Sequence, residues 1–163
     1  MIEIDSTARI SPLADIEDSV RGTRITIGPQ VAIDAFVKIK PAGGVGDVTI
    51  GEGSHLNSGT VIYTGNGIKI GKGVLIAANC TLAPTNHAFA RSDVPIRAQG
   101  FQASRGGVVI EDDVWIGANC VVLDGAVIRS GVVVGAGSVV RGELMAYGVY
   151  AGNPVRLLKM RIE

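Results

Sequence analysis

The amino-acid sequence predicts an all-β fold, a parallel β-helix with three short strands in each coil. Aliphatic residues recur every six positions, in groups of three, over nearly the whole chain. The composition agrees, because 39 Ile and Val stand against 8 Leu, and β-branched side chains favour pleated strands. The 23 glycines supply the tight turns that such coils need at their corners.

Six groups of three hexapeptides can be followed along the chain, which predicts about six coils in a single domain, residues 1–163. Insertions of 5, 5, 2, 22 and 0 residues separate the groups. Because every insertion follows a third repeat, we expect all of them to leave the prism at one corner, the longest as an excursion loop over 83–109. The aliphatic positions are Ile4, Ile10, Ile16; Ile27, Ile33, Ile39; Ile50, Leu56, Ile62; Ile70, Ile76, Leu82; Ile110, Ile116, Val122; Ile128, Val134, Val140.

A second small or apolar residue stands two positions before most of these aliphatic residues. Side chains alternate along a strand, so both should point into the prism and the residue between them outward. Cys80 and Cys120 occupy the same inward slot in neighbouring coils, where we expect two stacked thiols and no disulfide. A β-sandwich would show turn signals every 8–12 residues or so, which a strict six-residue step does not match.

Charge and hydropathy exclude several classes of function. Lys and Arg total 15, as do Asp and Glu, so the chain lacks the basic excess typical of nucleic-acid binders. No apolar run reaches the roughly 18 residues that a membrane span needs, and the first ten residues carry acids instead of the basic and apolar regions of a signal peptide. We therefore expect a cytoplasmic protein with no membrane insertion and no nucleic-acid partner.

The C-terminal residues predict a short helix over about 154–161. Asn153 can cap the helix and Pro154 suits its first position. Leu157 and Leu158 would then seal the open end of the prism. Arg156 and Lys159 would share one helical face, either to bind phosphate groups or as a solvated cationic face near the helix end.

Several segments resemble the hexapeptide-repeat acyltransferases, over about the whole chain. They are the repeats themselves, the segment from Asn86 to Gly100, the run from Val114 to Gly117, and the stretch from Ala136 through Asn153 and Pro154. The resemblance is closest to the sugar and polysaccharide O-acetyltransferases, the group of the maltose and galactoside enzymes. It implies a left-handed β-helix and a homotrimer that binds acetyl-CoA between subunits.

Two residues match active-site positions of that family. His87 stands where the excursion leaves the scaffold, and neutral imidazole can accept a proton from an attacking alcohol. By itself such a histidine is more often a surface loop residue; the resemblance makes His87 the expected general base. Asn57 matches an active-site asparagine of the galactoside-type enzymes, although asparagine is also favoured at such corners.

Further residues are expected at the cofactor site. Trp115 should face outward, which suits the family's boundary of the CoA channel or, alternatively, trimer packing. Ala118, Ala136 and Gly137 fall where the family's backbone contacts the pantetheine arm, or they merely fill corners. Arg156 and Lys159 match the pair that meets CoA phosphates.

No metal site is expected, because the related zinc anhydrases use three histidines and this chain has two, His87 and an outward-facing His55. The sequence thus predicts an acetyl-CoA-dependent O-acetyltransferase acting on a sugar or a surface-polysaccharide precursor. An N-acetyltransferase of a nucleotide-linked amino sugar is the nearest alternative. A non-catalytic or metal-binding trimer is a remote one.

Overall fold

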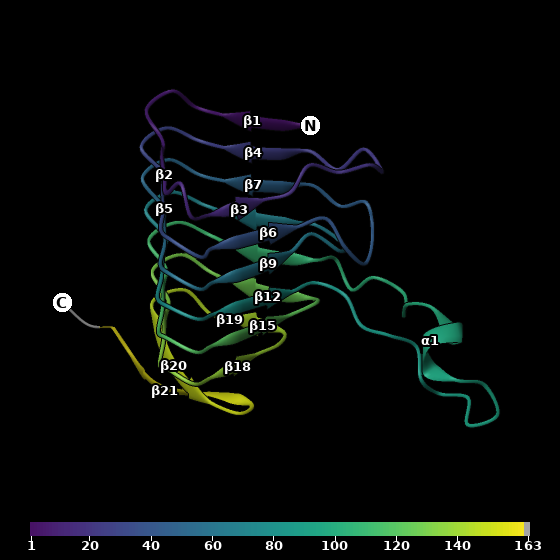
Figure 1. The fold of residues 1–163 in the computed structure, drawn as a ribbon. Helices are drawn as coiled ribbons and strands as arrows, with labels where there is room; N and C mark the ends of the chain where they lie inside the picture. The colour runs from purple at the N-terminus through teal and green to yellow at the C-terminus, as the bar shows by residue number, and fades with distance from the viewer. Residues whose placement is uncertain (162–163) are drawn as a thin grey trace.

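The computed structural model describes residues 1–161 and shows a three-sided prism whose coils stack along one axis (Figure 1). Each full coil contributes one strand to each of three parallel sheets, here called sheets A, B and C. There are six full coils and part of a seventh, and the sheet layout is that of a left-handed β-helix. The predicted repeat architecture is therefore confirmed.

The strands are short because each spans only one side of the prism. Sheet A contains β1 (Ile2–Ile4), β4 (Ile25–Ile27), β7 (Val48–Ile50), β10 (Ile68–Ile70), β13 (Val108–Ile110), β16 (Ala126–Ile128) and β19 (Glu143–Leu144). Sheet B contains β2 (Arg9–Ile10), β5 (Ala32–Ile33), β8 (His55–Leu56), β11 (Leu75–Ile76), β14 (Trp115–Ile116), β17 (Val133–Val134), β20 (Gly148–Gly152) and β21 (Val155–Met160). Sheet C contains β3 (Asp15–Ile16), β6 (Lys38–Lys40), β9 (Val61–Tyr63), β12 (Thr81–Ala83), β15 (Val121–Leu123) and β18 (Val139–Val140).

The repeat fixes the register, so equivalent residues of successive coils lie directly over one another. Leu56, Ile76 and Ile116 are consecutive Cα partners in sheet B, and all three are fully buried. Cys80 and Cys120 are buried free thiols in the core, as expected. The neighbouring Cys120 thiol and the burial of the site raise the pKa of Cys80.

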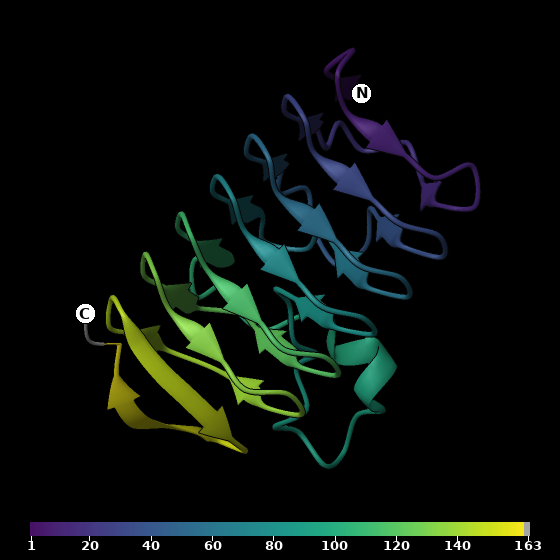
Figure 2. The ribbon, with the colours of Figure 1, turned by 90° about the vertical axis from the view of Figure 1, so that its left-hand side faces the viewer.

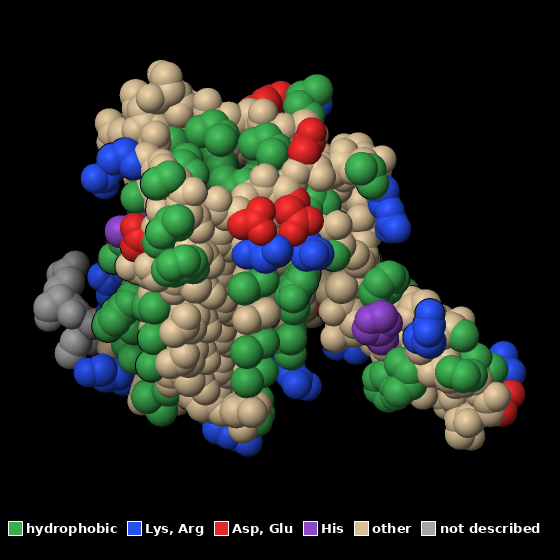
Figure 3. All heavy atoms as spheres, in the orientation of Figure 1, with side chains coloured by type: hydrophobic (Ala, Val, Ile, Leu, Met, Phe, Trp, Pro, Cys, Tyr) green, Lys and Arg blue, Asp and Glu red, His purple; other side chains and the backbone are tan. Residues whose placement is uncertain are grey.

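Within residues 1–161, insertions leave the prism only at the corner between sheets C and A. The long excursion departs after Ala83 and returns at Val108, and it carries α1 (Ile96–Gln99). Figure 3 shows it projecting away from the prism, while acidic and basic side chains lie side by side on the prism itself. Between β3 and β6, Lys38 bridges Asp15 and Glu17 at 2.8 and 3.0 Å.

The predicted C-terminal helix is wrong. The chain turns at Asn153–Pro154, whose peptide bond is cis, and returns as β21 antiparallel to β20 (Figure 2). The strand prevails because the edge of β20 offers a row of backbone donors and acceptors that a helix would leave open. Leu157 and Leu158 are about half and two-thirds exposed, so they do not seal the prism.

Arg156 and Lys159 nevertheless lie on one face, for a different reason. Arg156 is the Cα partner of Ala151 and Lys159 that of Val149, and these two residues flank the inward-facing Tyr150. A register shift at this point makes room for one extra residue in β21. The two cations therefore share the outer face of sheet B, although two residues stand between them along the strand.

Neighbouring residues of β10 test the inward and outward assignment. Ile70→Ala should lower the free energy of unfolding by about 2–5 kcal/mol, because Ile70 is only 3% exposed and its loss leaves a cavity. Lys69→Ala, one residue away on the outer face, should change it by less than about 0.5 kcal/mol. Urea denaturation followed by circular dichroism measures both. Equal losses in the two variants would contradict the register.

Candidate functional site

The excursion holds His87 at its base by a short antiparallel pairing of its two limbs. The Ala88 amide donates to the Gly100 carbonyl at 2.9 Å, and the Gln102 amide donates to the Asn86 carbonyl at 2.8 Å. Between these bonds His87 pairs with Phe101, and their ring centroids are 4.8 Å apart. The imidazole is exposed, and its ring nitrogens have no hydrogen-bond partner within residues 1–161. Aromatic packing therefore orients this ring.

A largely apolar hollow of about 280 Å³ opens beside His87. The aromatic walls of the hollow are Tyr63, on the outer face of sheet C, and Phe101. Gly43 lines it from the insertion between β6 and β7 with a φ of +80°, and a Cβ there would overlap the Thr85 side chain. A flat ring can lie against these walls with a hydroxyl directed at the imidazole.

Asp124 anchors the return limb of the excursion, a role that sequence reasoning missed. Its carboxylate is 4% exposed and accepts backbone N–H bonds from Arg105 and Gly107, both at 2.9 Å. The Asn66 side-chain amide donates to it as well, at 3.3 Å. The sequence feature that could have indicated this role is an acidic residue next to a glycine (Gly125) at the corner where insertions leave. A charged residue at a turn is usually solvated, however, so this feature is weak.

Asn57 does not lie in the His87 hollow. It occupies the corner between sheets B and C, and its side-chain amide donates to the Ile76 carbonyl at 2.9 Å. His87 leaves from the corner between sheets C and A. Within one chain the whole of sheet C separates the two residues.

The outer face of sheet B carries most of the other candidate residues. Trp115 faces outward as expected and is 53% exposed, next to Leu75, which is 48% exposed. Val133 and Val149 continue this apolar strip toward the cations on β21. None of these residues lines the His87 hollow.

The corner beside that strip brings backbone close to the surface. Ala118 is half-buried, whereas Ala136 and Gly137 are exposed, and the Gly137 amide donates to the Ala118 carbonyl at 2.8 Å. A Cβ on Gly117 would lie 2.6 Å from the Ala136 amide nitrogen, so only glycine fits at this approach. The corner is thus a smooth edge next to Trp115.

Residues 1–161 contain no group of three or more His, Cys, Asp or Glu side chains that could hold a metal ion. No helix in the same part of the chain is long and apolar enough to cross a membrane.

Comparison with known proteins identifies the family of this chain. Two family models match the chain: the bacterial transferase hexapeptide (six repeats) over residues 107–142, and the hexapeptide repeat of succinyl-transferase over residues 47–84. WbbJ of Escherichia coli K12, assigned as an O-acetyl transferase of lipopolysaccharide biosynthesis, is 34% identical over 145 residues, which are 85% of this chain and 69% of WbbJ. The chain belongs to the hexapeptide-repeat acyltransferases.

Other relatives of this family share a smaller part of their length with the chain. The galactoside O-acetyltransferase of Escherichia coli K12 is 33% identical over 69% of this chain, which spans only 54% of that enzyme.

Solved structures of hexapeptide acyltransferases superpose on almost the whole chain. AntD, an N-acyltransferase from Bacillus cereus, is 29% identical with a TM-score of 0.83, over 99% of this chain and 84% of that one. That structure is a complex with dTDP-4-amino-4,6-dideoxyglucose and coenzyme A. A maltose O-acetyltransferase from Clostridium difficile, at 24% identity and a TM-score of 0.64 over 87% of this chain and 71% of that one, shares the fold.

Removing the Asp124 carboxylate should loosen the excursion. Asp124→Ala leaves the buried Gly107 N–H and the part-buried Arg105 N–H without their acceptor, which should lower the free energy of unfolding by about 1–3 kcal/mol and speed trypsin cleavage after the excursion arginines. Asp124→Asn keeps one acceptor oxygen and should have a smaller effect on both. Urea midpoints and timed digestion provide the measurement. Wild-type cleavage rates in Asp124→Ala would refute the anchoring role.

Proposed function

We propose that this acyltransferase transfers an acetyl group from acetyl-CoA to a hydroxyl of a sugar or a surface-polysaccharide precursor, with His87 as the general base. The observation that carries the proposal is the position of His87. Its exposed imidazole stands at the mouth of a hollow with aromatic walls, in a chain 34% identical to an O-acetyl transferase. Aromatic walls suit the apolar face of a sugar ring.

The complete site requires a second copy of the chain. In one copy His87 projects from the corner between sheets C and A, whereas Trp115 and the cations occupy the outer face of sheet B. A closed trimer of prisms repeats one contact three times, so the His87 corner of each copy can face sheet B of the next. The exposed apolar strip on sheet B is the surface that such a contact would cover.

The outer face of sheet B fits an extended acyl-CoA. Arg156 and Lys159 at its C-terminal end can hold phosphate groups by charge-assisted hydrogen bonds. The strip formed by Val149, Val133 and Trp115 can cover the apolar arm, and the backbone edge at Ala118 and Gly137 supplies polar groups beside it. Coenzyme A brings the acetyl group as a thioester, which is activated toward attack by a hydroxyl.

In the reaction, His87 takes the proton of the acceptor hydroxyl as its oxygen bonds to the acetyl carbon. The bond from that carbon to sulfur breaks, and the protonated imidazole returns the proton to the departing sulfur. Atoms and charge balance without a covalent enzyme intermediate. The two cysteines take no part, since both thiols lie in the core.

A second candidate is N-acylation of a nucleotide-linked amino sugar, which the 29% identity to AntD favours. The same imidazole can accept the proton from an attacking amine. Incubation with free and nucleotide-linked sugars, followed by release of CoA thiol, identifies the acceptor. Mild alkali then separates the two reactions, because an ester product loses its acetyl group and an amide keeps it.

Replacing His87 should remove catalysis and leave the assembly intact. General-base help is worth about 10²–10⁴-fold, so His87→Ala should lose that much turnover with a hydroxyl acceptor. Acetyl-CoA affinity and a trimeric mass by light scattering should be unchanged, because the side chain lies outside the core. Release of CoA thiol measures the turnover of both proteins.

Two outcomes would contradict this assignment. A His87→Ala variant that keeps more than about a tenth of the turnover, with chemistry rate-limiting, excludes His87 as the base. A monomeric wild-type protein at micromolar concentration that is fully active excludes the site shared between copies.

The cations of β21 can be tested by binding alone. Arg156→Ala combined with Lys159→Ala should weaken acetyl-CoA binding by about tenfold or more for each cation–phosphate hydrogen bond that is removed. The loss of affinity caused by the double substitution should be smaller for dephospho-CoA than for CoA. Calorimetric titration measures both ligands. Full CoA affinity in the double variant would show that β21 only protects the edge of the sheet.

A further inference from the structure

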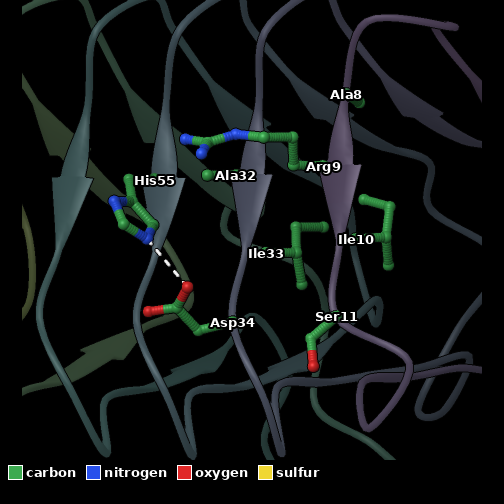
Figure 4. A pocket seen from close by; sticks show the side chains of 8 residues that line it. All are labelled: Ala8, Arg9, Ile10, Ser11, Ala32, Ile33, Asp34 and His55. Atoms are coloured by element: carbon green, nitrogen blue, oxygen red, sulfur yellow. Dashed lines mark hydrogen bonds and ion pairs between the residues drawn. The ribbon is translucent and has the colours of Figure 1, made fainter.

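A second hollow lies on the outer face of sheet B, in the first coils of the prism. It has a volume of about 570 Å³ and is lined by side chains of β2, β5, β8 and the corners that follow the first two of these strands. Figure 4 shows Arg9 extending over Ala32 toward His55, with Asp34 and Ser11 along one side. We call this hollow the sheet B notch.

The register creates the notch. Arg9, Ala32 and His55 are consecutive Cα partners on the outer face, so two long side chains flank a short one. Strand spacing places Arg9 and His55 about 10 Å apart at their Cα atoms. Ala32 is 8% exposed and forms the floor. The Arg9 side chain extends across this floor, which carries its guanidinium toward the His55 side of the notch.

The polar groups of the notch differ in how they are paired. His55 Nε2 lies 3.0 Å from Asp34 Oδ1, so this carboxylate fixes the imidazole. Asp34 Oδ2 accepts no hydrogen bond from residues 1–161 and remains open to a hydroxyl or amino group. The Arg9 guanidinium has no ion-pair partner in the same part of the chain, in contrast to Lys38 and Arg129, each of which contacts two carboxylates. A guanidinium fork of this kind matches phosphate oxygens.

The notch also lies at the end of the proposed acyl-CoA site where the acyl group is expected, opposite the cations of β21. The order along the outer face runs from the cations of β21 through the apolar strip and Leu75 to His55. Five strand steps separate β21 from β8, or about 24 Å. An extended CoA held by its phosphates at β21 would therefore direct its acyl end toward the notch.

We propose that the sheet B notch binds the acceptor through a phosphate or diphosphate group on Arg9, with Asp34 and His55 contacting the attached sugar. This inference rests on the proposed transferase function and specifies its substrate class, a phosphate-linked sugar. His87 of the neighbouring copy would then meet the sugar where the acyl end arrives. Free sugars lack the group that Arg9 holds and should bind far more weakly.

Binding measured without acetyl-CoA tests the notch separately from catalysis. The probes for calorimetric titration are dTDP-4-amino-4,6-dideoxyglucose, dTDP, inorganic pyrophosphate and maltose. Arg9→Ala should weaken binding of the first two by about tenfold, the value of a charged hydrogen bond. Arg24→Ala is the matched control, because Arg24 is an exposed arginine outside the notch. If pyrophosphate binds and Arg9→Ala weakens this binding, the notch recognises the phosphates alone. If pyrophosphate does not bind, the nucleoside contributes to binding.

Further variants separate the two halves of the site. Asp34→Asn should weaken the nucleotide sugar about fivefold or more while dTDP binding stays within twofold, because only the sugar meets this carboxylate. Arg9→Lys should restore part of the dTDP affinity by keeping the charge without the fork. Equal dTDP affinities of Arg9→Ala and Arg24→Ala, or maltose binding as tight as that of the nucleotide sugar, would overturn the proposal.

The outcomes distinguish the notch from the proposed function. Acetyl transfer that Arg9→Ala leaves unchanged in KM for the acceptor refutes the notch and leaves the transferase function in place. Arg9-dependent binding of dTDP with no transfer to any acceptor supports the notch and refutes the transferase function.

Discussion

The structure depends on one constraint, the in-register stacking of inward-facing side chains in successive coils. A slip of one residue in any strand would turn its buried aliphatic side chain outward. The register that fills the core also aligns the residues outside it, and the surfaces proposed to bind the ligands are these outer ladders. In sheet B the ladder consists of Arg9, Ala32, His55, Leu75, Trp115, Val133 and Val149.

Stacking also decides where loops can form. Two of the three corners are tight turns, and backbone of adjacent coils can approach so closely there that only glycine fits, as at Gly117. The third corner tolerates insertions, and there the chain builds the excursion that carries His87. An insertion interrupts the backbone pairing of the coils, and Asp124 replaces the missing acceptor with a side-chain carboxylate. A rigid scaffold thus presents His87, the proposed general base, at a fixed height along the prism.

Positive and negative side chains are equal in number, but cations in ion pairs and cations without them lie on different parts of the surface. On sheet A and its corner, Arg129 binds Glu111 and Glu143 at 2.7 Å, and its guanidinium holds the pKa of Glu111 below the usual range. Arg9 at one end of sheet B, and Arg156 and Lys159 at the other, form no ion pair within residues 1–161. Unpaired cations at both ends of one apolar strip are what a surface for two phosphate-bearing ligands requires.

The sequence by itself determined the prism, its six coils, the outward position of Trp115 and the corner from which His87 departs, because a six-residue period leaves little freedom in register. Only the tertiary structure decided the form of residues 153–160. Local capping signals there favour a helix, whereas the edge of β20 is open only because β20 belongs to the last coil of the stack. The tertiary structure also revealed the Asp124 anchor and the sheet B notch. Both join residues from different coils, and their meeting follows from stacking and not from any local pattern.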